Sequence, residues 1–310
     1  MSNMRLITRA DFDGLACGAI LTELGVIDSW KFVHPKDLQD GKIDVTEKDL
    51  LANVPYVTGC GMWFDHHASE LERIGVDATV EGAQYAAPSA ARIVYEYYGG
   101  SNRLPHMEEM VTAVDRVDSA HLTVDEIINP SGWILLGFIM DPRTGLGRHH
   151  NFTVGNWELM EELMDACRDF GIDELLMLPN VAERVEYYHK QTTDFRAMIL
   201  THSRKEGDVI ITDLRAVNPI HTGNRFVLYS LFPEQNSSLW IVDGIAGNCM
   251  IAAGHSILNR TSTVNVGTLM AKYGGGGHIQ VGTCQVPHDD ADAVIEELAA
   301  HFNDPANKTS

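Results

Sequence analysis

Short apolar runs alternate with segments of helical periodicity along the first half of the chain. Strands are expected over Met4–Ala10, Trp30–His34, Val54–Val57 and Met62–Asp65. Helices are expected over Asp13–Leu24, near 106–120, near 156–170, and where Ala86, Ala90, Ile93, Val94 and Tyr97 share one helical face. Strands that alternate with helices are typical of a mostly parallel sheet covered on both faces. We therefore expect an N-terminal α/β domain with a doubly wound sheet.

The second half follows a different pattern. One long helix with a largely polar surface is expected over 181–203, followed by strands over Val209–Asp213, Phe226–Leu231, Ser238–Val242 and Met250–Ala253. A helix over 265–273 precedes four glycines, and a last helix carries Ala291, Val294, Ile295, Leu298 and Phe302 on one face. This order predicts a smaller C-terminal α/β domain with a mixed sheet. We expect domains at 1–185 and 206–304, a connector helix at 186–205, and an active cleft between the domains.

Composition and charge exclude some classes of function and favour others. The 310 residues include 23 Lys and Arg against 43 Asp and Glu, a formal net charge of −20. Such a chain is poorly suited to long duplex nucleic acid, which is bound through Lys and Arg. The five cysteines form no CxxC pair, and the longest apolar run, Trp133–Met140, is far shorter than a membrane helix. We therefore expect reduced thiols, no membrane partner and a cytoplasmic location.

Carboxylates and imidazoles gather at the ends of predicted elements in the first half. The residues that share this position are Asp11, Asp13, Asp65, His66, His67 and Asp115; Arg9 and Asp118 lie in the same segments. Taken singly, each group has a plain alternative, such as a helix cap at Asp13 or a solvated face at Asp115 and Asp118. Together they favour a Mn²⁺ or Mg²⁺ site, because a structural zinc site would use Cys or more His. Such a metal is suited to phosphate chemistry.

A glycine run in the second half can bind an anion. Gly275, Gly276 and Gly277 are followed by His278, and the run comes after a predicted helix. A dinucleotide fingerprint or a Walker A loop would instead open a helix, so both are excluded. Backbone N–H groups of the run can hold an anion, with His278 and the upstream Arg260 as further donors. The alternative is a simple turn; we favour anion binding because ordering four glycines costs much conformational entropy.

In this order, the motifs resemble the DHH phosphoesterase family with its C-terminal DHH-associated domain. The resemblance rests on Asp11-Phe-Asp13-Gly14, Asp65-His66-His67, Asp115 and the run Gly274–His278, and it spans nearly the whole chain. The family includes RecJ-type exonucleases, short-oligoribonucleotide hydrolases, linear-dinucleotide phosphodiesterases and exopolyphosphatases. It implies a catalytic metal-binding domain over 1–185, a substrate-binding domain over 206–304, and a di-manganese site that activates water.

The resemblance also implies a role for each matching residue. Asp11 would serve one metal ion, and Asp13, His66 and Asp115 would serve the other. The expected catalytic residues are Asp65, His66, His67 and Arg9, with His67 on the scissile phosphate. Substrate binding is expected from Gly275, Gly276, Gly277, His278, Arg260 and Asn53.

Two features depart from the family pattern. Arg9 and Ile7 stand where the family carries a metal-binding His, and Asn53 stands where a metal-bridging Asp is expected. Arg9 can form a salt bridge with Asp11, or it can replace the first metal ion as a fixed positive charge. We therefore expect one firmly bound Mn²⁺ or Mg²⁺ and a weak or absent second ion.

The favoured function is a metal-dependent phosphoesterase acting on a small nucleotide-type substrate, such as a short oligonucleotide, a linear dinucleotide or a nucleotide bisphosphate. An exopolyphosphatase or pyrophosphatase is the first alternative, although the chain offers no dense basic run for polyphosphate. A nucleotide-binding protein with a degenerate metal site is the second alternative, because of Arg9 and Asn53. A homodimer is left open.

Overall fold

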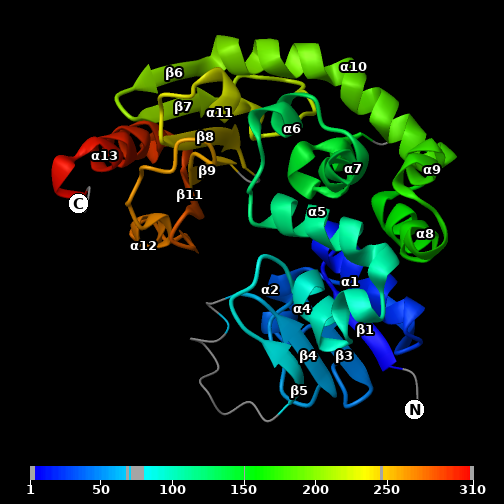
Figure 1. Cartoon of the computed structure of the whole chain (residues 1–310). Helices are drawn as coiled ribbons and strands as arrows, with labels where there is room; N and C mark the ends of the chain where they lie inside the picture. Colours follow the sequence, from blue (N-terminus) through cyan, green and yellow to red (C-terminus); the bar gives the residue numbers. More distant parts are fainter. Residues whose placement is uncertain (1–3, 68–69, 71–79, 150, 245–246, 308–310) are drawn as a thin grey trace. The chain divides into compact units, whose positions relative to one another are not determined.

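The computed structural model describes residues 4–67, 70, 80–149, 151–244 and 247–307. The chain forms two compact units (Figure 1), the first made of Met1–Leu122 and Asn129–His189. The second contains Thr123–Ile128 and Lys190–Ser310, and the division falls inside helix α10 (Pro179–His202). The short segment Thr123–Ile128 therefore belongs with the second unit, although it lies far inside the range 1–185 expected for the first domain.

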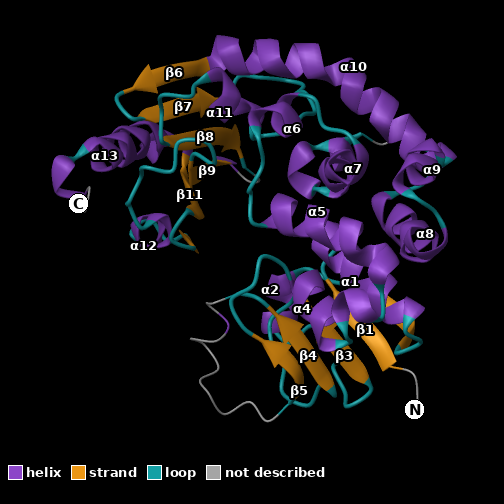
Figure 2. Cartoon of the chain, in the orientation of Figure 1, coloured by secondary structure: helices purple, strands orange, loops and turns teal. Residues whose placement is uncertain are grey.

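The first unit is built on a five-stranded parallel sheet (Figure 2). Its strands are β1 (Met4–Thr8), β2 (Ile27–Phe32), β3 (Asp49–Ala52), β4 (Met62–Asp65) and β5 (Glu81–Gln84). They follow the order β2-β1-β3-β4-β5, and every neighbouring pair is parallel. The direction of winding changes between β1 and β3. In open α/β sheets, ligands bind beyond the carboxyl ends of the strands at such a point.

Helices surround this sheet. They are α1 (Phe12–Glu23), α2 (Pro35–Gln39), α4 (Ala90–Tyr97), α5 (Glu108–Asp118), α7 (Gly132–Met140), α8 (Asn156–Asp169) and α9 (Ile172–Met177). Helix α1 packs on α4, α5 and α8, and α4 also contacts β4 and β5. Ile7, Leu51 and Trp63 of the strands join Leu38 of α2 in a separate apolar cluster. The sheet is thus covered by side chains that hold the carboxyl ends of β1, β3 and β4 in fixed positions.

Two expected elements are wrong. The strand expected at Val54–Val57 is absent, because β3 ends at Ala52, Asn53 has a φ of 56° and a proline follows at position 55. The strand expected at Phe226–Leu231 is helix α11 (Val227–Leu231), which contacts α6 (Val124–Ile128). A short apolar run fits a buried strand and a buried helical turn equally well, so the pattern alone could not separate them.

The second unit contains a six-stranded mixed sheet. Its strands are β6 (Ser203–Glu206), β7 (Val209–Asp213), β8 (Ser237–Asp243), β9 (Asn248–His255), β10 (Gly276–Gly277) and β11 (Val281–Pro287). The order is β10-β11-β9-β8-β7-β6; β7 and β8 pair in parallel, and the other neighbours are antiparallel. The α/β class with a mixed second sheet is confirmed.

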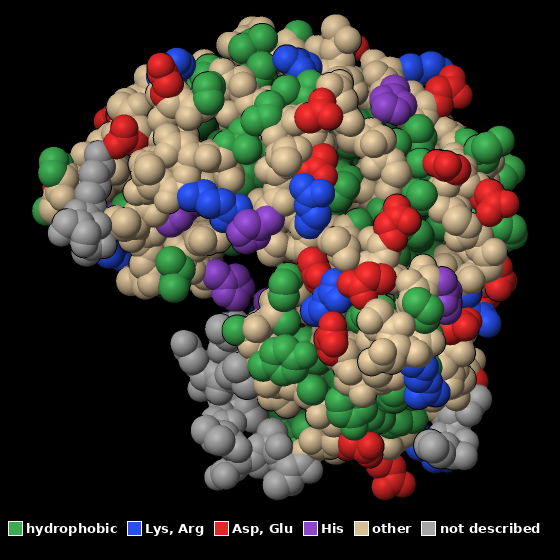
Figure 3. Space-filling model, viewed as in Figure 1, with side chains coloured by type: hydrophobic (Ala, Val, Ile, Leu, Met, Phe, Trp, Pro, Cys, Tyr) green, Lys and Arg blue, Asp and Glu red, His purple; other side chains and the backbone are tan. Residues whose placement is uncertain are grey.

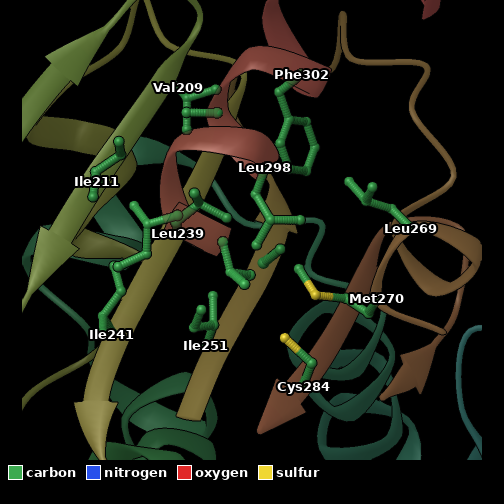
Figure 4. Close-up of a cluster of buried hydrophobic side chains, with 14 of the residues drawn as sticks. Val209, Ile211, Leu239, Ile241, Ile251, Leu269, Met270, Cys284, Leu298 and Phe302 are labelled. Atoms are coloured by element: carbon green, nitrogen blue, oxygen red, sulfur yellow. The ribbon is translucent and has the colours of Figure 1, made fainter. Parts of the chain in front are cut away.

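One face of this second sheet forms the core of the unit. Leu239 and Ile241 of β8 and Ile251 of β9 pack with α13 (Ala291–Asn303), which contributes Leu298 and Phe302 (Figure 4). Helix α12 (Val266–Ala271) adds Leu269 and Met270 to the same cluster. Strand side chains alternate between faces, so every second residue of β8, β9 and β11 is buried here.

The surface agrees with the acidic composition. On the face drawn in Figure 3, Lys and Arg side chains occur singly or in small groups among Asp and Glu, and no continuous basic area is visible on the described residues. Among the residues that the structure describes, no helix has both the length and the apolar character needed to cross a bilayer.

Candidate metal centre

The predicted site residues of the first unit lie where its central strands end. Arg9 comes just after β1, Asn53 directly after β3, and Asp65 is the last residue of β4. Since β1, β3 and β4 are neighbours, their carboxyl ends bring these residues to one edge of the sheet. This edge is the ligand crevice that the sheet order predicts.

Asp11 is held by three donors. Its carboxylate caps α1 by accepting a hydrogen bond from the Gly14 amide at 3.0 Å. Asn53 Nδ2 donates to Asp11 Oδ1 at 2.9 Å, and Arg9 Nε lies 3.1 Å from Oδ2. The salt bridge expected between Arg9 and Asp11 is therefore confirmed. Asn53 is buried and serves as a donor to a carboxylate, which a metal-bridging Asp could not do.

Asp13 lies in the first turn of α1, and its buried carboxylate faces the start of helix α4. Its two oxygens accept hydrogen bonds from the amides of Ala90 at 2.9 Å and Ala91 at 2.7 Å. Burial raises the pKa of the Asp13 carboxyl well above its ordinary value, and the charges of Asp118 and Asp11 act in the same direction. The two amide donors partly oppose this shift. A cation beside Asp13 would stabilise the charged form of this carboxylate.

His66 presents an unused nitrogen to two carboxylates. Its Nδ1 lies 3.2 Å from the Ala87 carbonyl oxygen, which fixes Nδ1 as the N–H donor and leaves Nε2 as a lone pair. Nε2 is 3.7 Å from Asp13 Oδ2 and 3.4 Å from Asp118 Oδ2. It is buried and has no hydrogen-bond partner among the described residues. The ligand atoms of Asp13, His66 and Asp118 all lie within 4.8 Å of one another.

Asp115 does not join this cluster. Its Oδ1 accepts a hydrogen bond from Ser89 Oγ at 2.7 Å, and its Oδ2 is 2.8 Å from Nε and 2.7 Å from Nη2 of Arg92. The structure therefore places Asp118, one helical turn further along α5, where Asp115 was expected. Burial raises the pKa of Asp118, as does the charge of Asp11, against the opposing effect of His66. The sequence motif pointed to Asp115 as the ligand; the orientation of α5 instead brings Asp118 to the cluster.

His67 forms a hydrogen-bonded pair with Asp65. Nδ1 of His67 lies 2.8 Å from Oδ1 of the buried Asp65. Partial burial lowers the pKa of His67, but the hydrogen bond to Asp65 and the negative charges around it outweigh burial and raise the pKa to about 9. The imidazole is thus a cation near neutral pH. Oδ2 of Asp65 is buried and has no hydrogen-bond partner among the described residues.

A small cavity adjoins the cluster. Asp11, Asp13 and Asp118 line it together with Arg143, whose Nε lies 2.8 Å from Asp141 Oδ1. The sequence motifs do not single out Arg143, whose segment is also typical of an ordinary surface loop. Its only signal was a Gly- and Pro-punctuated segment carrying two arginines. The cavity places one guanidinium beside three carboxylates, an arrangement that suits a metal ion and a phosphate group together.

Of the predicted phosphate-binding residues of the second unit, the glycines and His278 lie in or beside strand β10. Gly276 and Gly277 pair with β11, and the His278 amide donates to the Val281 carbonyl at 2.7 Å. A Cβ on Gly275 would lie 2.0 Å from the Thr283 carbonyl oxygen, so close backbone packing accounts for that glycine. The Nε of Arg260 donates to the carbonyl of Ile257 at 3.1 Å. Anion binding by this run stays a prediction.

Comparison with solved structures gives relatives that cover nearly the whole chain. The chain is 44% identical to a solved pGpG-specific phosphodiesterase, PggH, from Vibrio cholerae, with 98% of this chain and 100% of that chain covered and a TM-score of 0.85. A DHH domain from a member of the s1p family of ribosomal proteins is 12% identical, with coverage of 97% and 86% and a TM-score of 0.60, and it shows the fold alone. The sequence matches no protein-family model and no curated protein.

Proposed function

The chain belongs to the DHH phosphoesterase family and is a metal-dependent phosphoesterase acting on small nucleotide substrates; we propose that its substrate is a linear dinucleotide, with pGpG as the first candidate. The observation that carries the proposal is the cluster of Asp13, His66 and Asp118 in a chain 44% identical, over 98% of its length, to a pGpG-specific phosphodiesterase.

The cluster fits a divalent cation. Nε2 of His66 is a buried lone pair with no donor, and Asp13 and Asp118 place carboxylates beside it. One imidazole and two carboxylates are a ligand set that suits Mn²⁺ or Mg²⁺. When bound, such an ion polarises a phosphoryl oxygen and lowers the pKa of water. Asp13, His66 and Asp118 would hold the ion, instead of the expected set of Asp13, His66 and Asp115.

One ion is expected, because the neighbouring carboxylate is already neutralised. Arg9 and Asn53 both contact Asp11, so a second metal ion would have to displace a guanidinium and an amide donor. In this proposal Arg9 supplies the positive charge that a second ion would bring, and it binds a phosphoryl oxygen. Arg143, in the adjoining cavity, provides a second guanidinium for the same group.

His67 is the residue that we assign to proton transfer or phosphate binding. Asp65 accepts from Nδ1–H, orients the ring and stabilises the imidazolium form. The Nε2–H then donates to a phosphoryl oxygen or to the leaving oxygen. We also propose that phosphate is bound by residues of the second unit, namely Gly275–Gly277, His278 and Arg260.

The test is GMP release from pGpG by the full chain, with Mn²⁺ and with EDTA. His66→Ala should lose on the order of 100-fold or more of kcat/KM, because it removes a ligand of the ion. His106→Ala is the matched control, since this exposed histidine lies far along the chain on its own 3₁₀ turn. Tight binding of pGpG without turnover would contradict the proposal, as would hydrolysis confined to pyrophosphate or polyphosphate.

A further inference from the structure

The second unit contains a group of three potential metal ligands that the proposed phosphoesterase site does not use. Asp243, Cys249 and His288 each offer one ligand atom, and the three atoms lie within 4.8 Å of one another. The strand register explains why they meet. Asp243 and Cys249 are direct partners across β8 and β9, and His288 follows the last residue of β11, the next strand. Three strand ends therefore deliver three different donor types to one corner of the sheet.

We propose that Asp243, Cys249 and His288 form a binding site for Zn²⁺ that ties together the ends of β8, β9 and β11. A thiolate, an imidazole and a carboxylate are all ligands that zinc accepts, whereas the oxygen-rich cluster of the first unit suits harder ions. The two sites thus differ in the metal that they select. This proposal does not depend on the phosphoesterase site.

The distances fit a tetrahedral ion with small adjustments. Metal–ligand bonds of about 2.0–2.3 Å place neighbouring ligand atoms of a zinc site roughly 3.3–3.6 Å apart. Nε2 of His288 lies 2.8 Å from Oδ1 of Asp243, a little below this range, and all three ligand atoms lie within 4.8 Å of one another. Movement of the two exposed side chains is enough, because the side chains of His288 and Asp243 are 47% and 55% exposed.

The surroundings allow an ion to enter and supply a fourth position. His288 lines an open cavity of about 640 Å³, whose wall also includes Asp213 and Arg215. Water in this cavity can complete the coordination of a site with three protein ligands. Arg215 is neutralised by Asp213 and Asp292, each 2.6 Å from its Nη2, so its charge does not prevent a cation from binding.

Cys249 makes the site distinguishable from the first-unit cluster. Its side chain is fully buried at the edge of the core, and burial raises the pKa of the thiol while the nearby Arg215 opposes this effect. Zinc would bind the thiolate, so binding should release a proton. Cys17 Sγ lies 4.0 Å from Asp13 Oδ1 beside the first-unit cluster, so loss of a thiolate–metal signal in Cys249→Ala is what assigns that signal to the proposed site.

The experiment titrates the full chain with Co²⁺, a spectroscopic substitute for Zn²⁺, and follows the thiolate-to-cobalt charge-transfer absorption. We expect the band in the wild type and in His66→Ala, with displacement of one Co²⁺ by one Zn²⁺. Cys249→Ala should abolish the band, and His288→Ala should weaken binding at least 10-fold. Cys284→Ala is the matched control, since Cys284 is also a buried thiol of this core but lies outside the set.

Asp243→Asn keeps the proposal testable if Cys249→Ala fails to fold. This side chain is largely exposed, so its replacement should leave the fold intact and still weaken Co²⁺ binding by at least 10-fold. Absence of the band in the wild type would overturn the proposal. So would a band that survives Cys249→Ala, or affinities unchanged in both His288→Ala and Asp243→Asn.

Discussion

Arg92 holds Asp115 by a hydrogen bond from Nε at 2.8 Å and an ion-pair contact from Nη2 at 2.7 Å, and so fixes which aspartate of α5 faces His66. Arg92 belongs to the first turn of α4, whose amides at Ala90 and Ala91 bind Asp13. The first turn of α4 therefore positions Asp13 directly. It positions Asp118 indirectly, because the contact between Arg92 and Asp115 holds α5 in place. Asp115 is a structural residue in this arrangement.

Substitutions of Asp118 and Asp115 should have different effects. Asp118→Asn should lower Mn²⁺-dependent kcat/KM on the order of 100-fold or more, because a ligand carboxylate is lost. Asp115→Asn should cost about 1–3 kcal/mol in the free energy of unfolding, because Arg92 loses a charged partner. Urea unfolding of the metal-free protein and activity assays on both variants distinguish the roles. Loss of metal binding in Asp115→Asn together with normal binding in Asp118→Asn would reverse the assignment.

The number of metal ions bound per chain should change when Arg9 and Asn53 are replaced. In the native chain both residues engage Asp11, which we expect to limit tight binding to one Mn²⁺. Arg9→His with Asn53→Asp replaces a cation and an amide by a potential ligand and a carboxylate, so a second Mn²⁺ should bind tightly. Isothermal titration calorimetry with Mn²⁺ gives the number of ions bound per chain. Two tightly bound ions in the native protein would refute the single-ion hypothesis.

The end of one central strand of the first sheet follows from local sequence. The strand expected at Met62–Asp65 has those bounds, and the expected salt bridge between Arg9 and Asp11 is present. Both features depend on residues that are close in sequence, but β1 ends at Thr8 and Asp11 caps α1, so the Arg9–Asp11 pair does not follow from the period of a strand. A family resemblance then linked them to phosphate chemistry.

The choice between Asp115 and Asp118 could not be made in this way. Both lie on the same face of α5, and the difference arises from Ser89 and Arg92, which are distant in sequence. Tertiary packing also decided the fold of Val227–Leu231, where an apolar run became a helix against α6. Local periodicity carries no information on such contacts.

The pH dependence of stability should include a contribution from Asp49. This buried carboxylate accepts from Arg5 Nε at 2.7 Å and from the Thr46 amide at 2.6 Å. Burial raises the pKa of Asp49, but these hydrogen bonds and the charge of Arg5 outweigh burial and hold the pKa below its ordinary value of 3.8. The stabilisation is therefore complete above that value and is lost as the pH falls through the lower, folded-state pKa.

Asp49→Asn tests this contribution. At neutral pH the variant should be less stable by roughly 1–3 kcal/mol, because the charged partner of Arg5 is removed. The difference between the two proteins should shrink as the solution is acidified below the folded-state pKa. Denaturant unfolding at several pH values measures it, and a difference that stays constant down to strong acid would show that the charge of Asp49 is not the cause.

Two adjacent glycines of the predicted anion-binding run should respond differently to alanine. At Gly277 the φ is 155° and a Cβ would lie 2.2 Å from the Val281 carbonyl oxygen, so Gly277→Ala must disturb the pairing of β10 with β11. The expected loss is about 1–3 kcal/mol in the free energy of unfolding.

At Gly276 a Cβ would meet nothing within 4 Å, so Gly276→Ala should keep the stability of the native protein. If the run also binds the substrate phosphate, Gly276→Ala should raise KM for pGpG several-fold with kcat nearly unchanged, because binding of the ground state and of the transition state is weakened equally. Unchanged KM in this stable variant would leave the glycines with a packing role alone, the role already visible at Gly275 and Gly277.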